Sequence, residues 1–264
     1  AGGPRRRHPG AGLTPMLKLE SRPQPSQLMS LLSPLLALAL TVLIGVGLFL
    51  ILGKDPLRGL QVFFVEPVKN LYALSELSIK ATPLILIALG LAVCFRSNVW
   101  NIGAEGQFVI GALAGGWVAM QAGVHLAWMG RGIVVAILLA GVLGGMAWAA
   151  IVALLRDRFN ANEILVSLML VYVAQQFVNY LVFGPWKDPA GFNFPQTKNF
   201  DASTWLPLLL PGTRLNIGFV LALGLVALVW VFMFRSFRGY QLQVGGLAPA
   251  AARYAGFSGR SALW

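Results

Sequence analysis

The sequence predicts an all-α fold, a polytopic helical bundle that crosses a membrane about six times. Hydrophobic residues make up 57% of the 264 residues and charged residues only 11%, with a mean hydropathy of +0.73. An ordinary soluble domain carries roughly 25% charged residues, so this composition is that of a membrane protein. The spans must be helical, because hydrocarbon cannot satisfy open backbone groups and the alternating pattern of a barrel strand is absent.

A polar N-terminal segment, residues 1–27, precedes a single transmembrane domain at residues 28–264. Residues 1–15 are rich in Pro, Gly and Arg and come before the first methionine, Met16, so we treat them as an upstream extension. The first apolar run, 28–52, has no small-residue cleavage site at its end, which favours a signal anchor over a cleaved signal peptide.

Six apolar runs are candidate membrane spans. They lie at residues 28–52, 81–95, 106–120, 132–155, 164–183 and 215–234. The second and third runs are short for independent spans and are separated by a polar stretch. Two short apolar runs around a polar break are typical of discontinuous or re-entrant helices, so we expect one helix pair broken around residues 96–106.

The basic residues lie at the ends of the apolar runs. Counted between the spans, they place the N-terminus in the cytoplasm by a narrow margin. Membrane flanks explain the net charge of +11 better than nucleic acid does, because the cations are not interleaved with exposed aromatic residues on one polar segment. The chain stops within SALW, which reads like the start of another span, so we expect further C-terminal spans.

The polar stretch between the second and third runs contains a carboxylate, Glu105. At membrane depth Glu105 would be costly unless paired, and Arg96 or the free N-terminal amides of the next helix are the available partners. We expect Glu105 and Gln107 to fix the break, and Asn98 and Asn101 to hold its approach. The alternative is a cytoplasmic turn with an ordinary helix cap.

A second set of polar residues lies along the run at 164–183. Asn162 and Glu163 begin this helix, and Gln175 and Asn179, four residues apart, share one of its faces. Polar residues within an apolar span normally face the bundle interior, so these four are candidates for lining the path of a polar solute. Interhelical hydrogen bonds that only hold the bundle together are the alternative.

Two local pairings are also predicted. Glu76 and Lys80 are four residues apart and are expected to form a solvated pair. Glycines spaced four apart put small residues on one helix face and let neighbouring backbones approach. These glycines are Gly111 with Gly115, and Gly141 with Gly145.

No catalytic constellation is visible in the sequence. It has no GxxxxGK[ST] phosphate loop, no HExxH and no GxSxG elbow. The single cysteine, Cys94, lies in an apolar run and is expected to be a small buried residue. We therefore expect no cofactor and no metal, and any nucleotide that drives transport must be bound by another subunit.

Three motifs carry a family resemblance. They are NVWNIGAEGQFVIGALAG, NANEILVSLMLVYVA and GYQLQVGGLAPAAARYAGFS. The first resembles the NxxNIGxEGQ signature, the second NEVISTLMLNYIA, and the third the cytoplasmic coupling segment GxxLRAVGxNPxAARYAGI. These belong to permease subunits of ABC importers of the branched-chain amino acid, ribose and nucleoside group, closest to its nucleoside (simple sugar) branch. The sequence departs from the family pattern at Val171, Gln243, Gly245 and Ala248.

The resemblance implies a permease subunit that carries nucleosides or related simple sugars across the bacterial plasma (inner) membrane. It implies partnership with an ABC ATPase subunit, a second permease subunit and an extracytoplasmic substrate-binding protein, besides the small polar solute and the lipid bilayer. ATP hydrolysis is then expected on the ATPase subunit. The alternatives are a secondary transporter of a small polar solute and a structural membrane scaffold.

The coupling segment implied by the resemblance covers about residues 236–261, and its short helix would sit in a groove of the ATPase. Pro249 suits the first turn of that helix and Gly256 suits its end. An inert amphipathic loop on the membrane surface is the alternative. The residues expected to couple are Gly246, Leu247, Pro249, Ala251, Ala252, Arg253 and Gly256.

Overall fold

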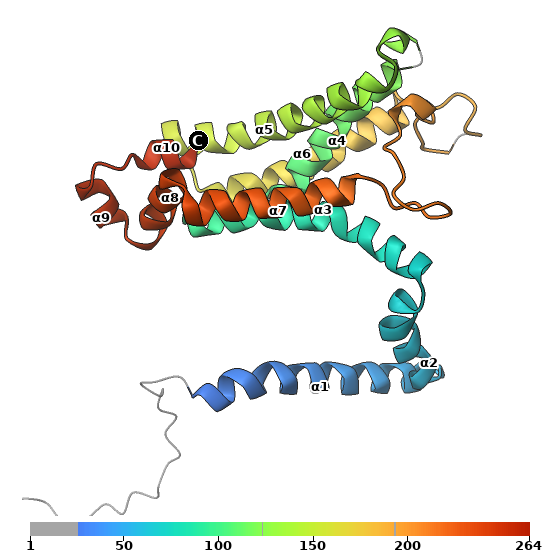
Figure 1. Ribbon diagram of the computed structural model, residues 1–264, viewed down its shortest axis with the longest axis horizontal. Coiled ribbons are helices and arrows are strands. Elements are labelled where there is room, and N and C mark those ends of the chain that lie inside the picture. The colour runs from blue at the N-terminus through green and yellow to red at the C-terminus, as the bar shows by residue number, and fades with distance from the viewer. Residues whose placement is uncertain (1–25, 123, 193) are drawn as a thin grey trace, which may run out of the picture. The chain divides into compact units, whose positions relative to one another are not determined.

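The computed structural model describes residues 26–122, 124–192 and 194–264, which are mostly helical (Figure 1). The predicted upstream extension, and nearly all of the polar N-terminal segment, lie outside the described residues. The chain divides into two compact units, Ala1–Val65 and Glu66–Trp264. Each unit is described by itself.

The described part of the first unit consists of one long apolar helix followed by a short helix. Helix α1 (Gln27–Ile51) starts at Ser26, whose side chain accepts the N–H of Met29, and its leucines are exposed on all sides. Such a helix suits a lipid environment. Helix α2 (Pro56–Leu60) has proline at its first position and is followed by a π-helical turn, Gln61–Val65.

The second unit is a helical bundle. Its helices are α3 (Leu71–Arg96), α4 (Ala104–Gln121), α5 (Ile133–Phe159), α6 (Glu163–Phe183), α7 (Gly218–Arg235), α8 (Phe237–Leu247), α9 (Pro249–Tyr254) and α10 (Gly259–Leu263). Helix α4 packs on α5 and α6, and α3 lies beside α7 (Figure 1). The short helices α8, α9 and α10 gather at the end of the bundle where α5 and α7 finish.

Five helices of the described residues are long and apolar enough to cross a membrane. They are Leu28–Ile51, Leu71–Arg96, Ala127–Phe159, Glu163–Phe183 and Gly218–Arg235. The sixth expected span forms helix α4, but its ends carry Glu105, Gln107 and Gln121, which lower its hydropathy below that of the other five.

The helix before the break is longer than the sequence predicted. Helix α3 begins at Leu71 rather than near Ala81, and Asn70 caps it by accepting the N–H of Ala73 at 2.7 Å. Glu76 and Lys80 interrupted the apolar run without interrupting the helix, because both residue types are good helix formers. The break itself lies at residues 97–103, within the predicted range.

Among the described residues no ion pair joins Glu76 to Lys80, and Lys80 acts on Glu76 only through a weaker electrostatic attraction. Glu76 instead forms a two-pronged ion pair with Arg214, whose Nε lies 2.9 Å from Oε1 of Glu76. A planar guanidinium matches a carboxylate better than an ammonium does, and this hydrogen bond raises the pKa of Arg214. The loop at 184–217 is thereby tied to α3. Within the loop, the backbone N–H of Ser203 binds Asp201 at 2.9 Å and lowers the pKa of that carboxyl.

The predicted glycine packing is confirmed between α4 and α5. A Cβ at Gly111 would lie 2.8 Å from the carbonyl oxygen of Gly141, and a Cβ at Gly145 would lie 3.2 Å from that of Gln107. The two backbones are therefore in direct contact, an arrangement that small residues make possible.

Candidate functional site

The break between α3 and α4 is an ordered turn held by side-chain amides. Asn101 and Gln107 exchange two hydrogen bonds, of 3.2 and 3.3 Å, across the break. The side-chain oxygen of Asn101 also accepts the N–H of Gly103 at 2.9 Å. Asn98 closes α3 in the left-handed conformation, φ 55°, and accepts the indole N–H of Trp100 at 3.2 Å. Asn suits position 98 because it tolerates positive φ better than most residues do.

Helix α6 supports the break from the side. The hydroxyl of Ser167, fully buried, accepts the N–H of Ile102 at 3.2 Å. A Cβ on Gly103 would lie 2.8 Å from the Cβ of Ser167, so the turn and the helix are in close contact. Ser167 is a supporting residue that sequence analysis did not single out, since its partner is 65 positions away.

The partner of Glu105 is on α6, not on α3. The side-chain amide of Gln175 donates to Oε1 of Glu105 at 3.3 Å. Arg96, one of the two predicted partners, instead places its guanidinium 4.8 Å from the centre of the Phe234 ring on α7. A cation over an aromatic face is a favourable contact in its own right. The structure therefore brings together two of the predicted residues that sequence analysis had assigned to different motifs.

The polar face of α6 is open on this chain. Gln175 and Asn179 are both exposed, as is Glu105, and Tyr172 lies one turn before Gln175. Gln175 is near the middle of a helix long enough to span the membrane. Exposed carboxylate and amide groups at that depth are costly against lipid, so they require another polar surface or water beside them.

Asn162 and Glu163 lie at the start of α6, apart from that face. Asn162 is the helix cap and accepts the N–H of Ile164 at 2.9 Å, and Glu163 binds Arg156 of α5 at 2.7 Å. Thirteen residues of helix separate Asn162 from Gln175, about 20 Å. Glu163 thus joins α6 to α5 at the end of the bundle, while Asn162 caps α6 itself.

The segment predicted to couple forms the three short helices α8, α9 and α10. Helix α9 begins with Pro249, and the chain leaves it at Gly256, φ 78°, as expected from the sequence. Ala252 is buried, while Ala251 and Arg253 are exposed. Leu247 and Tyr254 are 87% and 98% exposed, so α9 is flanked by two uncovered apolar side chains.

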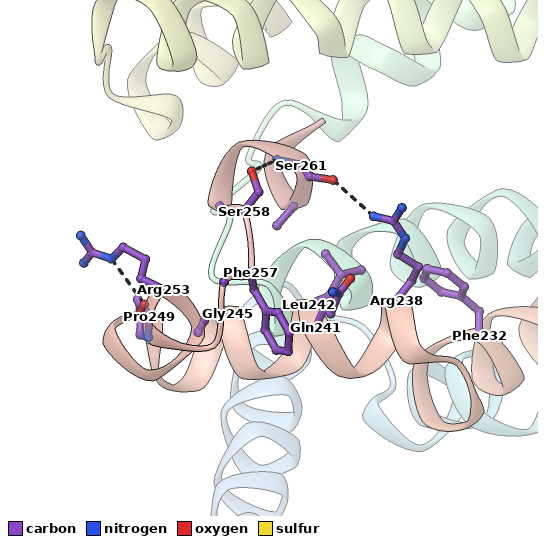
Figure 2. Close-up of a pocket in the computed structure, with 14 residues that line it drawn as sticks. Phe232, Arg238, Gln241, Leu242, Gly245, Pro249, Arg253, Phe257, Ser258 and Ser261 are labelled. Atoms are coloured by element: carbon purple, nitrogen blue, oxygen red, sulfur yellow. Dashed lines mark hydrogen bonds between the residues drawn. The ribbon is translucent and has the colours of Figure 1, made fainter.

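Helices α8 to α10, with Phe232 of α7, line a half-open pocket of about 580 Å³ (Figure 2). Phe257 forms part of its wall and packs edge-on against Phe237 and Tyr240, with ring centres 6.0 and 6.3 Å apart. Arg238 points toward Ser261 of α10, with Nη1 3.4 Å from the hydroxyl oxygen. The segment that forms α8, α9 and α10 is therefore an ordered subdomain and not an extended loop.

This subdomain contacts the end of α3 directly. Gly246 of α8 lies against the carbonyl group of Arg96, and a Cβ there would be 3.1 Å from the amide nitrogen of Asn98. Gln243, which stands where the family has Arg, donates from Nε2 to the carbonyl oxygen of Met233 at 2.5 Å. Gly246 is thus a packing residue, whereas Leu247 beside it is exposed.

The described residues contain no group of three or more His, Cys, Asp or Glu side chains that could hold a metal ion. One buried donor stands out. The indole nitrogen of Trp148 has no hydrogen-bond partner among the described residues and lies beside Gly106, where α4 meets α6. No sequence signal distinguishes Trp148 from the other tryptophans.

The chain matches known transport proteins. Residues 73–261 match the family described as branched-chain amino acid transport system / permease component. The glucose ABC transporter permease protein TsgB13 of Haloferax volcanii is 35% identical over 86% of this chain and 61% of its own length. The guanosine ABC transporter permease protein NupP of Bacillus subtilis is 29% identical over 89% of this chain and 66% of its own.

A third relative, the nucleoside ABC transporter permease protein NupB of Lactococcus lactis, is 25% identical over 88% of this chain and 65% of its own length. The chain thus spans between 61% and 66% of the length of these relatives. No solved structure matches it significantly. Several apolar helices long enough to span a bilayer and a family match over most of the sequence agree with one another. The chain is a multi-pass membrane protein that belongs to the family of permease components of branched-chain amino acid transport systems.

Proposed function

We propose that this chain is the permease subunit of an ATP-driven importer that carries nucleosides or related simple sugars across the plasma membrane. The names of its relatives, permeases for glucose, guanosine and nucleosides, support this choice of solute. ATP hydrolysis resides on a separate ATPase subunit. A second permease subunit and an extracytoplasmic binding protein complete the importer.

The observation that carries the proposal is the open polar face made by Glu105, Gln175 and Asn179. A carboxylate and two amides offer both donors and acceptors, the groups that sugar hydroxyls and nucleobase edges require. Two permease subunits that meet across this face would remove it from lipid and leave a polar path between them.

The subdomain of α8, α9 and α10 is the surface that meets the ATPase. Residues 236–261 contain arginines and no acidic residue, and an excess of cations marks the cytoplasmic side of a membrane protein. Leu247, Arg253 and Tyr254 are the exposed side chains around α9 that contact the ATPase groove. Successive spans then place the N-terminus in the cytoplasm as well.

The test is uptake by the complete importer in liposomes, with radiolabelled guanosine and glucose supplied in parallel. Uptake should require ATP inside the vesicles and should survive ionophores that collapse ion gradients. Uptake that follows an ion gradient without ATP would refute the proposal and identify a secondary transporter.

The polar face is tested by Gln175→Leu and Glu105→Ala, which should reduce or abolish uptake at normal expression. Gln176→Leu is the matched control, because the same change one residue further lies about 100° around the helix. Equal uptake by Gln175→Leu and Gln176→Leu would mean that this face does not line the path.

A further inference from the structure

Asp157 lies at a position in α5 that is electrostatically unfavourable for a carboxylate. It lies in the last turn of α5, between Arg156 and Arg158. The C-terminal end of a helix carries a partial negative charge, which favours cations and disfavours a carboxylate. The two arginines follow that rule and Asp157 breaks it, so a contact from outside the helix must offset the repulsion.

That contact comes from the far end of the sequence. One carboxylate oxygen of Asp157 accepts Nε of Arg260 at 2.8 Å and Nη2 at 2.7 Å, and it also accepts the indole N–H of Trp264 at 3.2 Å. The Asp157 side chain is only 13% exposed. Three donors meet on one shielded carboxylate oxygen, although the Arg260 side chain is itself 62% exposed, and together they join α5 to α10.

The junction closes a chain of contacts around the helix break. On one side, Gly246 of α8 touches the end of α3 at Arg96. On the other, α10 is joined to α5 through Asp157, and α5 touches the backbone of α4 at Gln107, where a Cβ on Gly145 would meet the carbonyl oxygen at 3.2 Å. The α8–α10 subdomain therefore contacts both sides of the break, directly at α3 and through α5 at α4.

We propose that Asp157 is a positioning residue for transport, which ties the α8–α10 subdomain to α5 through Arg260 and Trp264. When the ATPase displaces α9, the movement is transmitted to α3 through α8 and to α4 through α5. The break between α3 and α4 then changes shape. Without the junction, α10 and α5 move independently and ATP is hydrolysed without a matching movement of solute. The inference rests on the proposed function, since it assumes that α9 contacts an ATPase.

The experiment measures three quantities on the complete importer in liposomes: copurification of the ATPase subunit, ATP hydrolysis and solute uptake. The variants are Asp157→Asn, Arg260→Gln and the exchanged pair Asp157→Arg with Arg260→Asp. Arg158→Gln is the matched control, because it removes one charge near Asp157 at the same helix end but none of the hydrogen bonds of the junction. Membrane yield and melting temperature are recorded for each variant.

Each single junction variant should keep the ATPase bound and should lower the solute moved per ATP by about fivefold or more, the lower range of coupling between sites. The exchanged pair should recover most of that ratio, and Arg158→Gln should keep it. A purely structural role for Asp157 would lower yield, hydrolysis and uptake together and leave the ratio unchanged. That result, or an unchanged ratio in Asp157→Asn at normal yield, would overturn the proposal, as would failure of the exchanged pair to recover.

Failure of the proposed function would look different. If the unsubstituted chain neither bound an ATPase nor moved solute with ATP, the importer assignment and the positioning role would both fall. If the unsubstituted importer worked and the junction variants transported as much solute per ATP as it did, the importer assignment would stand. Only the role proposed for Asp157 would then be lost.

Discussion

The packing of α8 against α3 can be tested at two neighbouring glycines of α8, Gly245 and Gly246. The same substitution, glycine to alanine, is made at each position in turn. A Cβ on Gly246 would lie 3.0 Å from the carbonyl carbon of Arg96 and closer still to its oxygen, whereas a Cβ on Gly245 would have no atom within 4 Å. Because the obstructing atoms are backbone, they cannot rotate away. Gly246→Ala must therefore push α8 away from the end of α3.

The expected magnitudes follow from these contacts. Overpacking costs about 1–3 kcal/mol, and replacing glycine by alanine within a helix contributes roughly 1 kcal/mol of stability. Gly245→Ala should receive only the gain, while Gly246→Ala should show a net loss of up to about 2 kcal/mol. One kcal/mol shifts the melting temperature by roughly 2–4 °C in a chain of this size.

Thermal unfolding of the purified protein in detergent, followed by helical circular dichroism, measures the difference. Gly246→Ala should melt below the unsubstituted protein and roughly 2–12 °C below Gly245→Ala. Equal melting temperatures for the two variants would refute the close approach of α8 to α3. A loss in Gly245→Ala alone would show that the two positions are exchanged in register.

Three further predictions concern the bundle and its loop. Gly111→Ala places a Cβ 2.8 Å from the α5 backbone and should lower the melting temperature, whereas Gly116→Ala, which meets only an aromatic ring at 3.7 Å, should not. Asn101→Ala removes the hydrogen bonds across the break, so it should destabilise by about 1–3 kcal/mol and speed amide exchange there. The lowered pKa of Asp201 means that its cap is intact above the unfolded pKa of about 3.9 and is lost as pH falls through the lower folded value. Protection of that loop against amide exchange, relative to the intrinsic rate at each pH, should therefore fall only below about pH 4, and Asp201→Asn should remove this pH dependence.

Hydropathy alone located most of the bundle, because a span is a local property of about 20 successive residues. It placed the start of α3 ten residues late, since Glu76 and Lys80 are polar but helix-forming. The glycine spacing likewise predicted the α4–α5 contact, as both the spacing and its effect are local to each helix.

The partners of charged and polar residues were the part that sequence could not supply. Glu105 was expected to pair with Arg96 or with the N-terminal amides of the next helix; it lies in the first turn of α4, but its side-chain partner Gln175 is 70 positions away. The same holds for Glu76 with Arg214 and for Asp157, neither of which has its partner within its own helix. Such pairs are set by how helices are arranged in space, and a single sequence records only which residues could pair.

The amides that hold the break have a consequence for what can move it. Residues 97–103 include no ionisable side chain, and Asn101 and Gln107 hold the turn through groups that neither gain nor lose a proton at physiological pH. Protonation of side chains within the turn therefore cannot change its shape. A change in its shape is instead expected to come from the helices on either side, α3 and α4, as they move.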